Sequence, residues 1–86
     1  MTYAELKIDV ICEMTGDARG LVAEVVSMMQ KVLEAMGVDH AFMNEQIPAQ
    51  DLARARQKLF EDKELVTWYK KGLHYYHTVN QQGGMQ

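Results

Sequence analysis

The stretch Ile47–Val79, IPAQDLARARQKLFEDKELVTWYKKGLHYYHTV, decides the fold of this chain. Taken as one long amphipathic helix, it places mostly apolar residues on one face at spacings of three and four. These residues are Leu52, Ala55, Leu59, Val66, Tyr69, Leu73 and Tyr76. Two residues oppose this reading, because Asp62 falls on the same face and Gly72 in a helix interior costs about 1 kcal/mol relative to alanine.

The second half of the stretch also has the composition of a β-hairpin. LVTWY and LHYYHTV are dense in β-branched and aromatic residues, which pack well on a pleated surface. KKG (70–72) lies between them, and a three-residue hairpin loop needs glycine at its left-handed position. The polar run EDKE (61–64) would end the preceding helix. We therefore favour a helix over 49–62 followed by a hairpin, and keep one long helix as the alternative.

Two helices are predicted before this stretch. Thr2 followed by Glu5 fits a capping box, which favours a helix over 3–14. A strand is the alternative there, because apolar residues also alternate at Leu6, Ile8, Val10 and Cys12. Residues 18–36 carry an apolar stripe much broader than one helix face, ending at Gly37. A helix this apolar belongs in the centre of the core or in a subunit interface, so we expect a homodimer through helix 18–36.

Residues 39–79 resemble the winged helix-turn-helix family. AFMNEQIP is similar to the first helix and turn of that motif, and AQDLARARQKLFEDK to its recognition helix. ELVTWYKKGLHYYHTV resembles the two strands and tip of a wing. The resemblance covers about half of the chain. It implies an α+β fold, a small winged helix-turn-helix with an additional N-terminal helix and a C-terminal β-hairpin wing. An all-α helical hairpin is the alternative fold.

The resemblance also implies a DNA-binding surface. If Leu52, Ala55 and Leu59 are buried, the opposite face of helix 49–62 would carry side chains that read base edges or hold phosphates. The wing 65–79 would add two lysines at its tip. The predicted contacts are Gln50, Arg54, Gln57, Lys58, Lys70 and Lys71. A dimer would present two recognition helices to double-stranded DNA, as a transcriptional regulator or a phage- or plasmid-type accessory factor does.

Charge favours a different class of function. Residues 1–48 hold three Lys or Arg against eight Asp or Glu, whereas residues 49–86 hold six against four. The net charge of −3 opposes strong nucleic-acid binding. Seven methionines suit an adaptable protein-binding surface. The alternative is therefore a non-enzymatic protein-interaction module, an adaptor, inhibitor or enzyme-associated regulator, without nucleic-acid binding.

Other features limit the remaining classes. The length fits a single domain over 1–79 with a flexible tail over 80–86. No apolar run of about 18 residues predicts a membrane span, and no secretion signal is evident, so we expect a cytoplasmic protein. Cys12 is expected to be buried and inert. No catalytic set, metal-ligand pattern or phosphate-binding loop is recognisable, so we expect neither an enzyme nor a cofactor.

Overall fold

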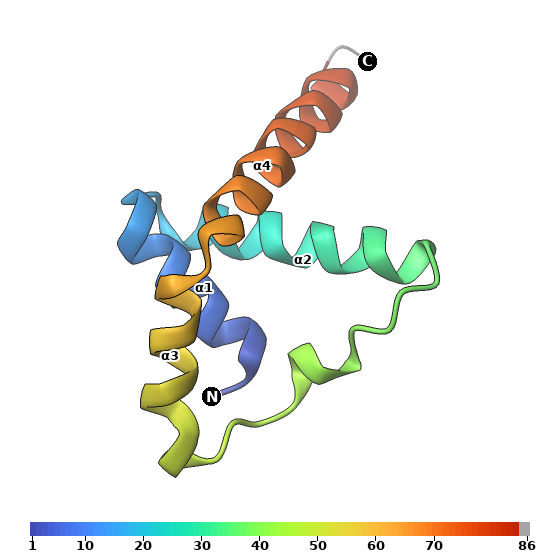
Figure 1. The fold of residues 1–86 in the computed structure, drawn as a ribbon. Coiled ribbons are helices and arrows are strands. Elements are labelled where there is room, and N and C mark those ends of the chain that lie inside the picture. The colour runs from blue at the N-terminus through green and yellow to red at the C-terminus, as the bar shows by residue number, and fades with distance from the viewer. Residues whose placement is uncertain (85–86) are drawn as a thin grey trace.

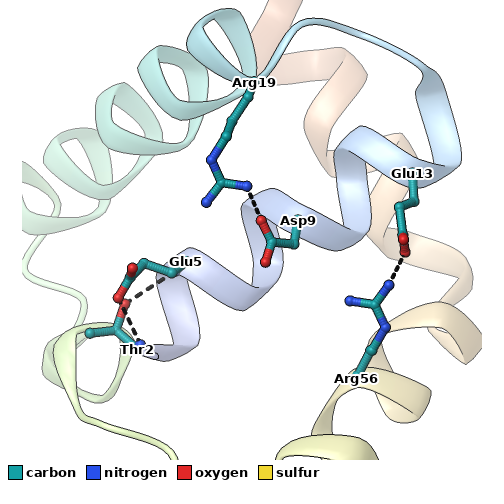
Figure 2. A network of polar contacts seen from close by, with 6 residues as sticks. All are labelled: Thr2, Glu5, Asp9, Glu13, Arg19 and Arg56. Carbon is teal, nitrogen blue, oxygen red and sulfur yellow. Dashed lines mark hydrogen bonds and ion pairs between the residues drawn. The ribbon is translucent and has the colours of Figure 1, made fainter.

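Helix α1, Tyr3–Thr15, begins at the predicted capping box. In the computed structural model, the Glu5 amide donates to the Thr2 hydroxyl over 3.1 Å, and the Thr2 amide donates to the Glu5 carboxylate over 2.9 Å (Figure 2). The helix ends at Gly16, whose φ of 76° is in the left-handed region that favours glycine. Leu6, Val10 and Ile11 are buried at helical spacing, so the helix prediction for this segment is confirmed and the strand alternative is wrong.

Helix α2, Arg19–Ala35, follows after a short turn and matches the helix expected over 18–36. Its buried residues are Val22, Val25 and Val26. The chain then leaves the helix through Gly37, which also has a positive φ. The structure describes residues 1–84, and within them α2 lies against both α1 and α4 (Lys63–Gly84) (Figure 1).

The connection from α2 to α3 (Leu52–Glu61) is long and is held to the start of α1. It contains two short 3₁₀ helices, η1 (Ala41–Asn44) and η2 (Ala49–Asp51). Residues Thr2 and Gln46 form an isolated antiparallel bridge, and the rings of Tyr3 and Phe42 meet edge to face at 5.5 Å. The predicted first helix of a helix-turn-helix is therefore replaced by one 3₁₀ turn and an extended segment.

The predicted β-hairpin wing is wrong. Residues 63–84 form one helix, α4 (Lys63–Gly84), and the described part of the chain contains four α-helices and no β-strand. The α+β winged-helix fold is thereby overturned, and the structure fits the all-α alternative. Lys70 and Lys71, expected at a wing tip, lie inside α4.

The stretch is not one unbroken helix either. Helix α3, Leu52–Glu61, stops at Asp62, which has an extended conformation (φ −77°, ψ 105°). The Asp62 carboxylate accepts a hydrogen bond of 2.9 Å from the Glu64 amide, as an N-cap residue of α4 does. The single apolar face of the stretch is therefore divided between two helices that both pack on α1.

Gly72 explains why the hairpin prediction failed. The residue is buried in α4, and α4 crosses α2 (Figure 1). A Cβ atom at this position would lie 2.9 Å from Met29 Cγ and 3.0 Å from Val25 Cγ1. The glycine thus permits a close approach of two helices, and it is not there to form a left-handed turn. The aromatic residues around it were attributed to a pleated sheet, but tertiary packing overrides such a preference.

The core lies where α1, α2, α3 and α4 meet. Its buried residues are Leu6, Val10, Ile11, Val22, Val25, Val26, Leu59, Leu65 and Tyr69. Within residues 1–84, none of the helices combines the length and the apolar character needed to cross a bilayer. Residues 80–84 of the predicted tail belong to α4, and residues 85–86 lie outside the described part of the chain.

One buried hydrogen bond ties α4 to the turn between α1 and α2. Tyr69 is only 1% exposed, and its hydroxyl donates to the Asp17 carboxylate over 2.6 Å. Burial, followed by this hydrogen bond, raises the pKa of Tyr69 well above its ordinary value of 10.0. The phenol therefore stays protonated in the folded chain at pH values where an unfolded chain begins to lose the proton.

Substitution of Gly72 tests the close crossing. We expect Gly72→Ala to lower the free energy of unfolding by about 1 kcal/mol, because overpacking costs about 1–3 kcal/mol and exceeds the gain in helix propensity of about 1 kcal/mol. Gly20→Ala is the matched control, since a Cβ there meets no atom within 4 Å in the first turn of α2. That control should stabilise the protein slightly in urea unfolding. Equal stabilisation by both substitutions would contradict the crossing.

Removal of the Tyr69 hydroxyl tests the link to Asp17. Tyr69→Phe should lower the free energy of unfolding by about 1–3 kcal/mol near neutral pH, because a charged acceptor loses its donor. The raised pKa means that the folded state binds more protons above pH 10, so wild-type stability falls as pH rises beyond that value. The difference between wild type and variant should therefore shrink in alkali. Tyr75→Phe, at a half-exposed ring, is the control. A difference that is constant from about pH 8 to about pH 11 would refute the assignment.

Candidate functional site

Two helices extend beyond the core after they cross. From the crossing at Gly72, α2 continues towards the loop at Gly37 and α4 continues towards its C-terminus in a different direction (Figure 1). We call residues 29–36 the α2 arm and residues 72–80 the α4 arm. An open depression of about 270 Å³ lies in the angle between these helices, and we call it the notch. It is lined by Met29, Val32, Lys71 and Tyr75.

Apolar side chains follow both arms outward from the notch. Met36 is 71% exposed at the end of the α2 arm. On the α4 arm, Tyr75 is 50% exposed and Val79 is 43% exposed. Val32 and Met36 are four residues apart, as are Tyr75 and Val79, so each pair lies on one face of its helix. The arms thus expose two apolar strips that start at the buried crossing.

The charges around the notch differ between the two arms. The sequence from Leu65 to Asn80 contains Lys70 and Lys71 but no Asp or Glu. The last turn of α2 has no basic residue, and its Glu34 side chain is 73% exposed. Lys31, one turn earlier, balances Glu34 within the α2 arm, and Glu34 Oε2 lies 3.9 Å from His40 Nε2. Lys71 is therefore the charged side chain that lines the notch itself.

A second, more polar depression of about 570 Å³ lies on another side of the α2–α4 crossing. The Tyr76 hydroxyl donates to the Glu24 carboxylate there, which joins the two helices. Its lining is Ala23, Glu24, Ser27, Met28, Lys31, Tyr76 and Asn80. Because the Tyr76 hydroxyl and the Glu24 carboxylate of its lining already pair with each other, these two groups are less free to bind a partner.

Two ion pairs lie around Cys12 on the exposed side of α1. Arg19 pairs with Asp9, and Arg56 of α3 pairs with Glu13 (Figure 2). Each guanidinium is thus neutralised by a carboxylate, so the pocket of about 330 Å³ that these residues line is not an anion site. Burial, followed by the charge of Asp17, raises the pKa of the Cys12 thiol. A thiol that holds its proton is a poor nucleophile, which fits a structural role.

Lys7 also makes a contact within the chain. Its ammonium lies 3.9 Å from the centre of the Trp68 ring, so α1 and α4 make a cation–π contact. Burial lowers the pKa of Lys7, while the nearby Asp62 carboxylate opposes the change. Among residues 1–84, no three His, Cys, Asp or Glu side chains gather closely enough to hold a metal ion.

The predicted nucleic-acid contacts lie on three elements. Gln50 belongs to η2, three others belong to α3, and the two lysines belong to α4. All six side chains, those of Gln50, Arg54, Gln57, Lys58, Lys70 and Lys71, are exposed. The Gln57 amide donates to Glu61 over 3.1 Å on its own helix. Lys71 lines the notch, whereas Lys70 lines another depression, near Asp17.

Of the residues that line the notch, only Lys71 was predicted from the sequence as a binding residue. Tyr76 was placed on the apolar face of the stretch, and Tyr75 and Val79 were assigned only to a strand of the predicted wing. The three-four spacing of Met29, Val32 and Met36 was visible in the sequence and was attributed to the core or an interface without distinction. Only the position of the crossing shows which part of each strip is left open.

Comparison with known proteins supplies no function to carry over. No family model, no curated protein and no solved structure matches the chain. Its function has therefore to be inferred from its own surfaces.

Proposed function

We propose that this chain is a non-enzymatic protein-interaction module whose contact surface is the notch with its two arms. The observation that carries the proposal is the exposure of Met36, Tyr75 and Val79 on helices that run beyond the core. Contiguous apolar groups left on a surface are typical of an interaction site. The angle between two diverging helices suits the apolar face of a partner helix, which is a recurrent mode of recognition.

The chemistry of the notch supports a protein partner. Methionine side chains are flexible and polarisable, so Met29 and Met36 suit an adaptable surface. Tyr75 offers a large amphipathic ring of the kind enriched in interface centres. Lys71 at the rim can cover apolar surface with its stem and keep its charge in water.

Other features support the absence of catalysis and weigh against the DNA-binding alternative. Two groups that could react are held in internal contacts: the Cys12 thiol keeps its proton, and the Tyr69 hydroxyl is bonded to Asp17. Two of the predicted DNA contacts, Lys70 and Lys71, depended on a wing that is a helix. The net charge of −3 also disfavours a phosphate partner.

The contact surface can be tested by partner capture with a pair of matched variants. Met36→Glu combined with Val79→Glu places a charge on each arm, and Phe60→Glu changes an exposed apolar residue of α3 that is outside the notch. We expect wild type and Phe60→Glu to retain the same partner protein in affinity capture. The double variant should lose it while its circular dichroism stays helical. Loss in both variants, or in neither, would contradict the assigned surface.

Duplex DNA provides the opposing test. In fluorescence anisotropy we expect no binding that weakens between about 50 mM and about 200 mM salt, the range over which phosphate contacts lose strength. Steep salt-dependent binding, further weakened by Arg54→Ala and Lys58→Ala, would overturn the proposal in favour of the predicted DNA surface.

A further inference from the structure

A pocket of about 320 Å³ lies between the end of α1 and the first half of α4, beside the turn at Asp17. We call it the Asp17 pocket. Small-molecule sites commonly measure about 300–1,000 Å³, so this volume suits a ligand about the size of a single amino acid. The described residues that line this pocket and those that line the notch are all different. The two are therefore separate sites.

Two hydrogen bonds fix the position of Asp17 at this pocket. Its carboxylate oxygen Oδ2 accepts the bond from the hydroxyl of Tyr69, a residue that is only 1% exposed. Its backbone amide donates to the Thr15 hydroxyl over 3.2 Å. Neither bond uses the other carboxylate oxygen, Oδ1, which has no hydrogen-bond partner among residues 1–84. The pocket therefore holds a positioned carboxylate with one oxygen free to accept from a ligand.

Lys70 brings the opposite charge to the same pocket. It follows Tyr69 on α4, and its side chain is exposed. Asp17 and Lys70 both line the pocket, yet neither belongs to an ion pair in the part of the chain that the structure describes. A carboxylate and an ammonium thus share one pocket without pairing with each other. A ligand with one group of each charge would pair with both.

The other walls of the pocket are apolar. Val66 and Leu73 lie about one turn to either side of Lys70 on α4, and both are half-buried. Met14, at the end of α1, is 40% exposed. Apolar walls with a few placed polar groups are the usual composition of a small-molecule site.

We propose that the Asp17 pocket binds a free α-amino acid with an apolar side chain. The ammonium of the ligand donates to Asp17, its carboxylate pairs with Lys70, and its side chain lies on the apolar walls. Charge complementarity selects this class of ligand. An amine without a carboxylate would bring a second cation to Lys70, and an acid without an amine would bring a second anion to Asp17. This site does not depend on the interaction surface proposed above.

The first test is a titration of the isotope-labelled protein with L-leucine at millimolar concentration, followed by amide chemical shifts. We expect saturable shifts at residues 14–17 and 66–73. Isoamylamine, which is leucine without its carboxylate, and isocaproate, which is leucine without its amine, should each bind at least about tenfold more weakly. Equal binding of all three compounds would overturn the zwitterion, and saturable shifts confined to the notch would overturn the location.

The second test separates the two charges with variants. Lys70→Gln should weaken leucine binding about tenfold without weakening isoamylamine binding, because only the carboxylate loses its partner. Lys71→Gln, at the neighbouring lysine that lines the notch, is the matched control and should bind leucine as wild type does. Asp17→Asn keeps an acceptor for the Tyr69 hydroxyl, and it should weaken leucine binding without weakening isocaproate binding. Leucine binding that is unchanged in both Lys70→Gln and Asp17→Asn would contradict the assigned contacts.

Thermal unfolding gives an independent measure. A ligand in the Asp17 pocket contacts α1, the turn after it and α4 only in the folded chain, so leucine should raise the melting temperature by mass action. The rise should be smaller in Lys70→Gln than in Lys71→Gln. No saturable shift and no rise in melting temperature with leucine would overturn the proposal. That result would leave the capture experiment on the notch unaffected, since the two sites share no lining residue.

Discussion

The close contact between α2 and α4 at Gly72 is the constraint on which the rest of this structure depends. Because residue 72 has no side chain, Val25 and Met29 can lie within about van der Waals distance of the α4 backbone. This contact fixes where the two longest helices cross and brings Tyr69, one turn earlier, into the core, where its hydroxyl reaches Asp17. The turn between α1 and α2 is thereby linked to α4, and the three helices form one packed unit.

The same crossing also determines which surfaces stay open. Leu65 and Tyr69, before the crossing on α4, are buried in the core, and Leu73 and Tyr76, just after it, still pack against the core. Beyond them α4 extends away from the core (Figure 1). The apolar strips of the two arms are therefore continuous with the core although they lie outside it. Apolar strips that continue along two helices beyond the core can provide a small protein with a binding surface. This continuation is the physical basis of the proposed interaction module.

Local features of this fold could be predicted from the sequence more accurately than the arrangement of its helices in space. The Thr2–Glu5 capping box and the stripe of α2 depend on neighbouring residues, and both were predicted correctly. Gly72 was misinterpreted because glycine serves equally in a left-handed turn and in a close helix crossing, and only the presence of α2 opposite α4 distinguishes the two. From the sequence, Asp62 was a polar residue on an otherwise apolar face. In the structure it lies between α3 and α4, where its carboxylate accepts a hydrogen bond from the Glu64 amide as an N-cap does. The notch was not foreseen, because core and exposed parts of an apolar strip have the same spacing in the sequence.

Nuclear Overhauser effects between Gly72 and α2 would test the central claim most directly. We expect cross-peaks from the Gly72 α-protons to the methyl groups of Val25 and Met29, together with helical backbone shifts on both sides of Gly72. Cross-peaks from Gly72 that connect instead to the facing strands of a hairpin, with strand-like shifts around it, would contradict the crossing and with it the two arms and the notch.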